Sequence, residues 1–338
     1  MSEPSSATAP IVLGVRLRSV LGRIPSLGLK LTPYLLLVLL ELVYVSKQPD
    51  AFTRLAIGFT VAGGLCLAFA AAGQTIVIMT GGIDLSVGGV ISLATVLAAT
   101  RYHNSSASIL AWTVLIVLIG AGAGALNGIL LVWLNLQPFI VTLATWSFWS
   151  GVAFWILPVE GGLIPQRLLD WVNTNPAGFA VPIWILVLGL LLWMLVRRSA
   201  LMFRIRAIGS NRDSAYLSGV NVPLTLITAY AISGACAAAG GVFLATQISS
   251  GSPNIGDDFI LQAVAAVVIG GASLFGGNGS VAASVAGAFV LTLAGSVVFA
   301  LGFSSQLEGV IRALILAAAI IAVSAGTLIK RRRQGRIA

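Results

Sequence analysis

Residues 55–100 read LAIGFTVAGGLCLAFAAAGQTIVIMTGGIDLSVGGVISLATVLAAT, two apolar runs joined by a glycine-rich break. We place the runs at Leu55–Thr80 and Leu85–Thr100. A helix needs about 20 apolar residues to cross a ~30 Å hydrocarbon core, so the first run is long enough and the second is short. Two glycine pairs between the runs permit a tight turn or a broken helix, which membrane proteins tolerate where protein or a water-filled cavity covers the backbone.

The rest of the chain has the same character. Of its 338 residues, 58% are hydrophobic and 9% are charged, and the mean hydropathy is +1.02. Soluble domains carry roughly 25% charged residues, so this composition excludes them, and its apolar excess excludes disorder. The 38 glycines have no triplet period, which excludes collagen, and they favour close helix approach instead. The sequence therefore predicts an all-α polytopic membrane protein.

Apolar runs recur along the whole chain and predict about ten transmembrane helices. They are placed at Leu31–Val45, Leu55–Thr80, Leu85–Thr100, Ile109–Trp133, Phe139–Leu157, Val181–Val196, Val222–Ile248, Phe259–Gly271, Val281–Ala300 and Leu307–Ile329. The stretch Pro158–Ala180 lies between two runs and carries Trp171, an expected interfacial anchor.

Basic residues predict the orientation, because cytoplasmic loops are enriched in Lys and Arg. With ten spans, 14 of the 19 basic residues fall on the side of both termini, which are therefore expected in the cytoplasm. These 14 are Arg16, Arg18, Arg23, Lys30, Arg197, Arg198, Arg204, Arg206, Arg212, Lys330, Arg331, Arg332, Arg333 and Arg336. We expect a cytoplasmic segment at residues 1–30, one transmembrane domain at 31–329 with a cytoplasmic loop at 197–221, and a basic tail at 330–338. The clustering of basic residues on the cytoplasmic side accounts for the net charge of +9, so no nucleic-acid partner is expected.

The first glycine-rich break contains a carboxylate. Gly81 and Gly82 precede Asp84, and Ser86 follows it. Intramembrane carboxylates are expensive and tend to be functional, so one interpretation places Asp84 on the transport pathway. The other makes Asp84 and Ser86 helix N-caps on a short re-entrant turn.

A second segment resembles the first. It contains Gly270, Gly271, Gly276, Gly277 and Asn278 and also separates two runs on the predicted cytoplasmic side. Matching broken helices in two halves point to a transporter, and these residues are further pathway candidates. The glycines form no GxxxxGK[ST] phosphate loop, so we expect this chain not to hydrolyse nucleotide itself.

The predicted cytoplasmic loop has the shape of a docking element. Asn211 is a candidate N-cap for a short helix from Arg212 to Leu217, Asp213 lies in its first turn, and Gly219 is its expected stop. The alternative is a plain solvated connector.

The remaining ionisable residues form no pattern typical of an enzyme or a metal site. The sequence offers no nucleophile–base set, no paired carboxylates in one span and no metal-ligand cluster, so we expect no catalytic residues, metal or cofactor. Glu41 lies mid-span and His103 in a short loop. Asn254, Asp257 and Asp258 form a polar entry on the outer side and are candidate contacts for an extracytoplasmic partner.

Four segments resemble the permeases of bacterial ABC importers for simple sugars of the ribose, xylose and arabinose type. They are TGGIDLSVGG at 80–89, QPFIVTLAT at 137–145, AIGSNRDSAYLSGVNV at 207–222 and AAVVIGGASLFGGNGS at 265–280. The third is also similar to the importer pattern E-A-A followed three residues later by Gly, with Asp213, Ser214, Ala215 and Gly219 in those places. The first two letters differ, although the carboxylate is kept as Asp.

The resemblance implies a multi-pass protein of the bacterial inner membrane that works within an assembly. Its partners would be an ATP-binding cassette subunit that uses ATP, an extracytoplasmic sugar-binding protein, and a second permease, identical or paralogous, in membrane lipid. It further implies alternating access, with coupling to the ATPase near Asn211–Gly219. The alternative from a different class is an ion-coupled secondary transporter of a small polar solute, in which Glu41 and Asp84 would be the candidate ionisable groups.

Overall fold

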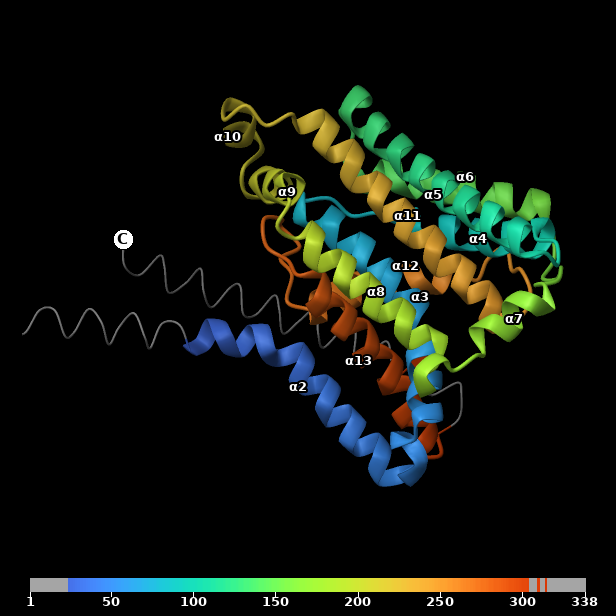
Figure 1. The fold of residues 1–338 in the computed structure, drawn as a ribbon. Coiled ribbons are helices and arrows are strands. Elements are labelled where there is room, and N and C mark those ends of the chain that lie inside the picture. The colour runs from blue at the N-terminus through green and yellow to red at the C-terminus, as the bar shows by residue number, and fades with distance from the viewer. Residues whose placement is uncertain (1–23, 304–308, 311–313, 315–338) are drawn as a thin grey trace, which may run out of the picture.

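The computed structural model describes residues 24–303 together with 309, 310 and 314. The regular structure in this part of the chain is helical, apart from one isolated bridge between Gly161 and Gly251, and turns and irregular loops connect the helices (Figure 1). The α-helices are α2 (Ile24–Lys47), α3 (Arg54–Met79), α4 (Val87–Arg101), α5 (Ser106–Leu134), α6 (Pro138–Ile156), α7 (Gln166–Val172), α8 (Val181–Val196), α9 (Ala200–Ser210), α10 (Arg212–Leu217), α11 (Val222–Ile248), α12 (Asp257–Ile269) and α13 (Val281–Ala300). Short 3-10 turns cover Pro49–Phe52 and Pro176–Gly178.

Nine of the ten predicted runs coincide with helices. Most bounds agree within a few residues, but α2 begins at Ile24 instead of Leu31, so part of the predicted cytoplasmic segment continues the first helix. The predicted run Leu307–Ile329 falls almost entirely, and the tail at 330–338 entirely, outside the described residues, as do residues 1–23.

Five of the described helices are long and apolar enough to cross a membrane by themselves: α3, α5, α6, α11 and α13. A sixth candidate is α8 taken together with α9, although the two helices are bent by 75° at their junction. The short helix α4 is apolar but has only 15 residues. The structure thus confirms an all-helical chain with several candidate spans.

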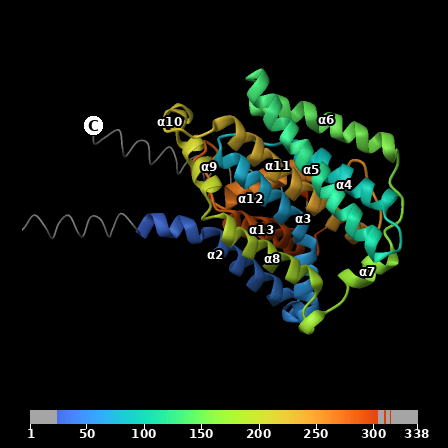
Figure 2. The ribbon, with the colours of Figure 1, turned by 45° about the horizontal axis from the view of Figure 1, so that its top comes forward.

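The centre of the bundle is formed by α3, α4, α11, α12 and α13 (Figure 2). Helix α11 packs along α5, α3 and α4, while α13 packs against α3, α2 and α12. Residues 87–99 of α4 are all buried, so this short helix is enclosed by protein on every side. In Figure 2, α5 and α6 lie on one flank and α2 on the other, with α3, α11, α12 and α13 between them.

Small residues bring α5 and α11 together. Gly120, Gly124 and Gly128 recur every four residues and face the backbone of α11. A Cβ at Gly124 would overlap the carbonyl oxygen of Tyr230, and one at Gly128 would overlap the Cα of Ile227. This is the close helix approach that glycine spacing permits in membranes.

The loop at 197–221 contains a helix that the sequence reading missed. Helix α9 begins after Ser199, whose hydroxyl accepts a hydrogen bond from the Met202 amide at 3.4 Å. Its buried side chains are Met202, Ile205 and Ile208, spaced every three residues along one face. This spacing was the available signal for an amphipathic helix.

Candidate translocation and coupling site

The first glycine-rich break is organised by Asp84. Its carboxylate is fully buried, and Oδ1 accepts hydrogen bonds from the Ser86 amide at 3.0 Å and the Ser86 hydroxyl at 2.6 Å. Oδ2 accepts a third bond, at 2.8 Å, from the hydroxyl of Ser233 on α11. A buried carboxylate is stable only when donors of this kind satisfy it. The bond from Ser233 therefore attaches the break to α11, which is distant in the sequence.

Side chains from other helices complete this group. Asn127 on α5 donates from Nδ2 to the Ser86 hydroxyl at 2.7 Å. With its amide nitrogen turned toward the Asp84 carbonyl, Gln74 on α3 donates to that oxygen at 3.0 Å and accepts from the Asp84 amide at 3.2 Å. We call Gln74, Asp84, Ser86, Asn127 and Ser233 the Asp84 cluster; it joins the break to α3, α5 and α11.

The capping interpretation is corrected in part. Ser86 is the N-cap residue of α4, as predicted, but its hydroxyl accepts no helix amide and donates to Asp84 instead, so the predicted side-chain cap is wrong. Asp84 does accept the Ser86 amide, as in an Asx turn. Within the part of the chain that the structure describes, the hydrogen bonds of the Asp84 carboxylate go to Ser86 and Ser233. A pathway role for Asp84 stays a prediction.

The second break lies against the first. Its turn is closed by a hydrogen bond from the Ser273 amide to the Asn278 carbonyl at 3.0 Å. The Gly277 amide donates to the carbonyl of Met79, the last residue of α3, at 3.0 Å. A Cβ on Gly276 would also lie 3.1 Å from the Gly81 nitrogen, so the two segments that look alike in the sequence are in direct contact, which the sequence alone did not reveal.

Helix α9 ends at the same place. A Cβ on Gly209 would overlap the Met79 carbonyl oxygen and the Gly277 nitrogen, and one on Gly276 would lie 2.6 Å from the Gly209 carbonyl oxygen. We call Met79, Gly209, Gly276 and Gly277 the glycine junction. It brings the predicted coupling segment into contact with both breaks.

The short helix α10 confirms the expected local geometry. Asn211 Oδ1 accepts the Ser214 amide at 2.8 Å, as predicted for an N-cap. Gly219 has φ +80°, and its amide donates to the Tyr216 carbonyl at 2.9 Å. Asp213 and Ser214 are exposed, Ala215 is buried against α11, and Leu217 is 85% exposed. In Figure 1, α9 and α10 lie at one end of the molecule and α7 at the other.

The predicted polar entry lies at the start of α12. Asn254, Asp257 and Asp258 are all exposed. Asp257 Oδ1 accepts a hydrogen bond at 2.8 Å from Nε1 of Trp146 on α6, so this carboxylate also joins two helices. In the described part of the chain, no group of three His, Cys, Asp or Glu residues could hold a metal ion.

Sequence reasoning missed three members of the Asp84 cluster. Gln74, Asn127 and Ser233 each lie inside a long apolar run. Polar side chains in such runs tend to face the bundle interior and bond to one another, and that was the available signal. Two buried polar atoms have no partner in the described structure: Oδ1 of Asn127, within the cluster, and the hydroxyl of Tyr230.

Comparison with known proteins identifies the family. A model described as "branched-chain amino acid transport system / permease component" matches residues 56–331. The chain belongs to this permease family.

Several curated relatives are similar to this permease. It is 36% identical over 265 residues to the galactofuranose transporter permease protein YtfT of Escherichia coli, covering 76% of each chain. It is 31% identical over 296 residues to the ribose import permease protein RbsC of Bacillus subtilis, covering 86% of this chain and 92% of the relative. With the D-allose transport system permease protein AlsC of E. coli, it shares 30% identity over 221 residues, 65% of this chain and 68% of the relative. No solved structure matches.

Proposed function

We propose that this permease is the membrane-spanning subunit of an ATP-driven ABC importer that carries a monosaccharide across the bacterial inner membrane. The observation that carries the proposal is the family match over residues 56–331, together with relatives whose names specify galactofuranose, ribose and allose. The family consists of permeases, not enzymes, and we assign this chain no catalytic residue. ATP would be used by a separate subunit, and the permease itself would need no cofactor.

The proposed topology has about ten spans with both termini in the cytoplasm. The five long apolar helices support it, as do α2, α4, α8 and α12 at four further predicted runs. In this topology residues 31–329 form one transmembrane domain, and α9 and α10 lie in the cytoplasm with their basic residues. The second and third runs then lie on either side of the first break, whose backbone is covered by the Asp84 cluster.

Reporter fusions test this topology. Fusions after Ser210 and at the C-terminus are both expected to report a cytoplasmic location, because the basic residues of 197–212 and 330–336 then share a face. A fusion within Asn173–Pro176 serves as the control and is expected outside. Opposite locations for the first two fusions would contradict ten spans.

The proposed mechanism is alternating access driven through α10. The ATP-binding cassette subunit would contact the exposed face around Asn211, Asp213 and Ser214, while the opposite face of this helix packs through Ala215. Motion of α10 reaches α9 directly, and α9 meets both breaks at the glycine junction. Because packed interfaces switch between discrete arrangements, a small displacement at α10 can reorient both breaks together.

The proposal includes two further protein partners. A sugar-binding protein would dock at the end that carries Asn254, Asp257 and Asp258. A second permease, identical or paralogous, would complete the pathway within the lipid bilayer. The glycines and polar residues of the two breaks, including Gly81, Gly82, Gly270, Gly271 and Asn278, remain pathway candidates in this proposal.

Gly219→Pro is expected to uncouple ATP hydrolysis from uptake while the protein still inserts. Proline fixes φ near −65° and has no amide hydrogen, whereas Gly219 has φ +80° and donates to Tyr216. The turn from α10 into α11 would therefore change direction. Gly219→Asn is the matched control, since Asn tolerates positive φ. Coupled transport at the wild-type ratio of sugar to ATP in Gly219→Pro would contradict the docking role of α10.

Affinity purification from the native membrane, followed by mass spectrometry, tests the proposed function. We expect a Walker-motif ATPase to co-purify, together with an extracytoplasmic sugar-binding protein. Recovery of the permease alone, with uptake that survives ATP depletion and fails when the ion gradient collapses, would instead identify an ion-coupled secondary transporter.

A further inference from the structure

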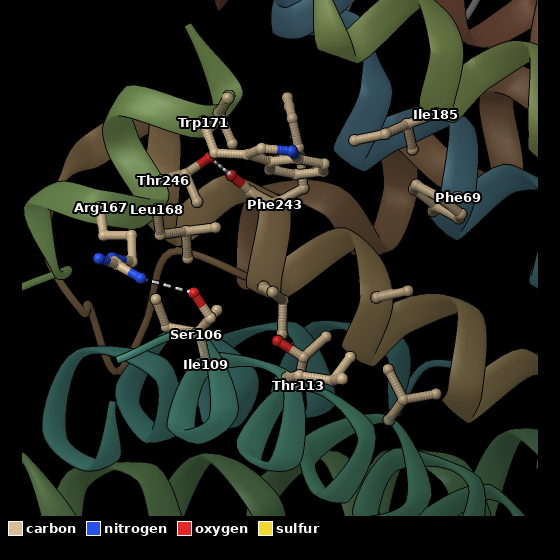
Figure 3. A pocket seen from close by; sticks show the side chains of 15 residues that line it. Phe69, Ser106, Ile109, Thr113, Arg167, Leu168, Trp171, Ile185, Phe243 and Thr246 are labelled. Atoms are coloured by element: carbon tan, nitrogen blue, oxygen red, sulfur yellow. Dashed lines mark hydrogen bonds between the residues drawn. The ribbon is translucent and has the colours of Figure 1, made fainter. Parts of the chain in front are cut away.

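A crevice runs along α8. Its larger chamber has a volume of about 580 Å³ and lies among α3, α5, α7, α8 and α11 (Figure 3). A second chamber of about 300 Å³ shares Phe69 and Ile185 with the first and continues to Trp193. Both are of the size that holds small-molecule ligands, roughly 300–1,000 Å³.

The crevice is open on the outer surface of the bundle. Leu110 lines the larger chamber and is 66% exposed, and Leu192 lines the smaller one and is 53% exposed. In a membrane these helix faces meet acyl chains. Because an unfilled apolar cleft loses the dispersion contacts of its whole lining, such a cleft is occupied by apolar groups from its surroundings.

The two ends of the larger chamber differ in chemistry. The α7 end carries the exposed side chains of Arg167 and Trp171, and Arg167 Nη1 donates to the hydroxyl of Ser106 at 2.8 Å. Among the described residues, Arg167 forms no ion pair with a carboxylate, so its charge has no counter-ion within this part of the chain. Figure 3 shows Arg167 and Trp171 at one side of the chamber, with Phe69 and Ile185 at the other.

A sugar does not suit this chamber. Its hydroxyl-bearing side chains beyond Ser106 are Thr113 and Thr246, and both already have partners. Thr113 shares a 2.7 Å hydrogen bond with Tyr102, and Thr246 donates to the Phe243 carbonyl. A cationic mouth beside a Trp, leading into an apolar slot, matches instead a molecule with an anionic head and a hydrocarbon tail.

We propose that the crevice binds one anionic phospholipid, with its phosphate on Arg167 and one acyl chain along α8. In the proposed topology, Trp171 would lie at headgroup depth beside Arg167, as expected of an interfacial aromatic residue. The chain passes Phe69 and Ile185 into the second chamber. The bound lipid then fills the space between α8 and the core formed by α3 and α11, and it contacts no residue of the Asp84 cluster.

The test uses the purified permease complex in nanodiscs of equal parts phosphatidylglycerol and phosphatidylcholine. After transfer to detergent, native mass spectrometry counts the retained lipids. We expect the wild type to retain phosphatidylglycerol selectively. Arg167→Gln should lower the ratio of phosphatidylglycerol to phosphatidylcholine about fivefold, the effect of one interfacial cation. Arg101→Gln, the same change of charge at the end of α4, should leave the ratio unchanged.

A second variant tests the acyl-chain slot separately. Ala239 on α11 lines the larger chamber, and Ala239→Phe is expected to reduce retention of both lipids by narrowing that chamber. An unchanged ratio in Arg167→Gln, or unchanged retention in Ala239→Phe, would overturn the proposal. So would a wild-type complex that retains no phospholipid, because a protein segment would then be the occupant. Size-exclusion profiles matching the wild type confirm that each variant is folded.

Discussion

Gly209→Ala is expected to reduce ATP-driven uptake strongly, because the added methyl group overpacks the glycine junction. The new Cβ would overlap the Met79 carbonyl oxygen and the Gly277 nitrogen, which are both backbone atoms that no rotamer change can move. Overpacking of this kind costs about 1–3 kcal/mol, a factor of roughly 5 to 150 in the population of the packed junction. Initial uptake rates at saturating ATP measure the effect.

Gly122→Ala provides the matched control. Gly122 also lies within a helix, but a Cβ there would meet no atom within 4 Å. Its uptake and membrane abundance should equal those of the wild type. If Gly209→Ala inserts normally and transports like Gly122→Ala, the glycine junction does not transmit motion between α9 and the breaks.

Asp84→Ala is expected to destabilise the permease by about 2–6 kcal/mol. It removes the acceptor of two buried hydroxyls, Ser86 and Ser233, and each unpaired buried donor costs about 1–3 kcal/mol. The first break would then lose its bond to α11. Thermal unfolding in detergent, followed by loss of monodisperse protein, measures the change.

Asp84→Asn separates the structural role from the pathway role. An Asn side chain retains an acceptor for Ser86, and its amide can donate to the Ser233 oxygen. We therefore expect Asp84→Asn to insert, assemble and transport normally. A stable Asp84→Asn protein that has lost all transport would show that the carboxylate charge itself acts on the pathway.

Features of local structure, which depend on residues close together in the chain, were predicted best from the sequence. The Asn211 cap, the helix from Arg212 to Leu217 and the stop at Gly219 are encoded within nine residues, and the structure confirms them. Nine apolar runs became helices for the same reason, because local hydrophobicity and backbone hydrogen bonding determine them. Helix α9 was missed because its sequence mixes basic and apolar residues, and its three buried positions were not read as a face.

Contacts between distant segments could not be predicted in this way. Asp84 was recognised as unusual, but its partner Ser233 lies 149 residues away. The contact between Met79 and Gly277 likewise depends on how α3, α12 and α13 pack, and the similarity of the two breaks gives no distance between them. Apolar runs show where the helices are but not which helices pack together, since many arrangements of the helices would bury the same apolar surface.

Uptake energetics test the central claim most directly. Cells expressing the permease with its co-purifying partners are supplied with radiolabelled ribose, allose or galactose, and ATP and the ion gradient are depleted separately. The proposed function predicts that uptake stops when ATP is depleted and persists when an ionophore collapses the gradient while ATP is maintained. Uptake that follows the gradient and ignores ATP would contradict an ABC importer permease.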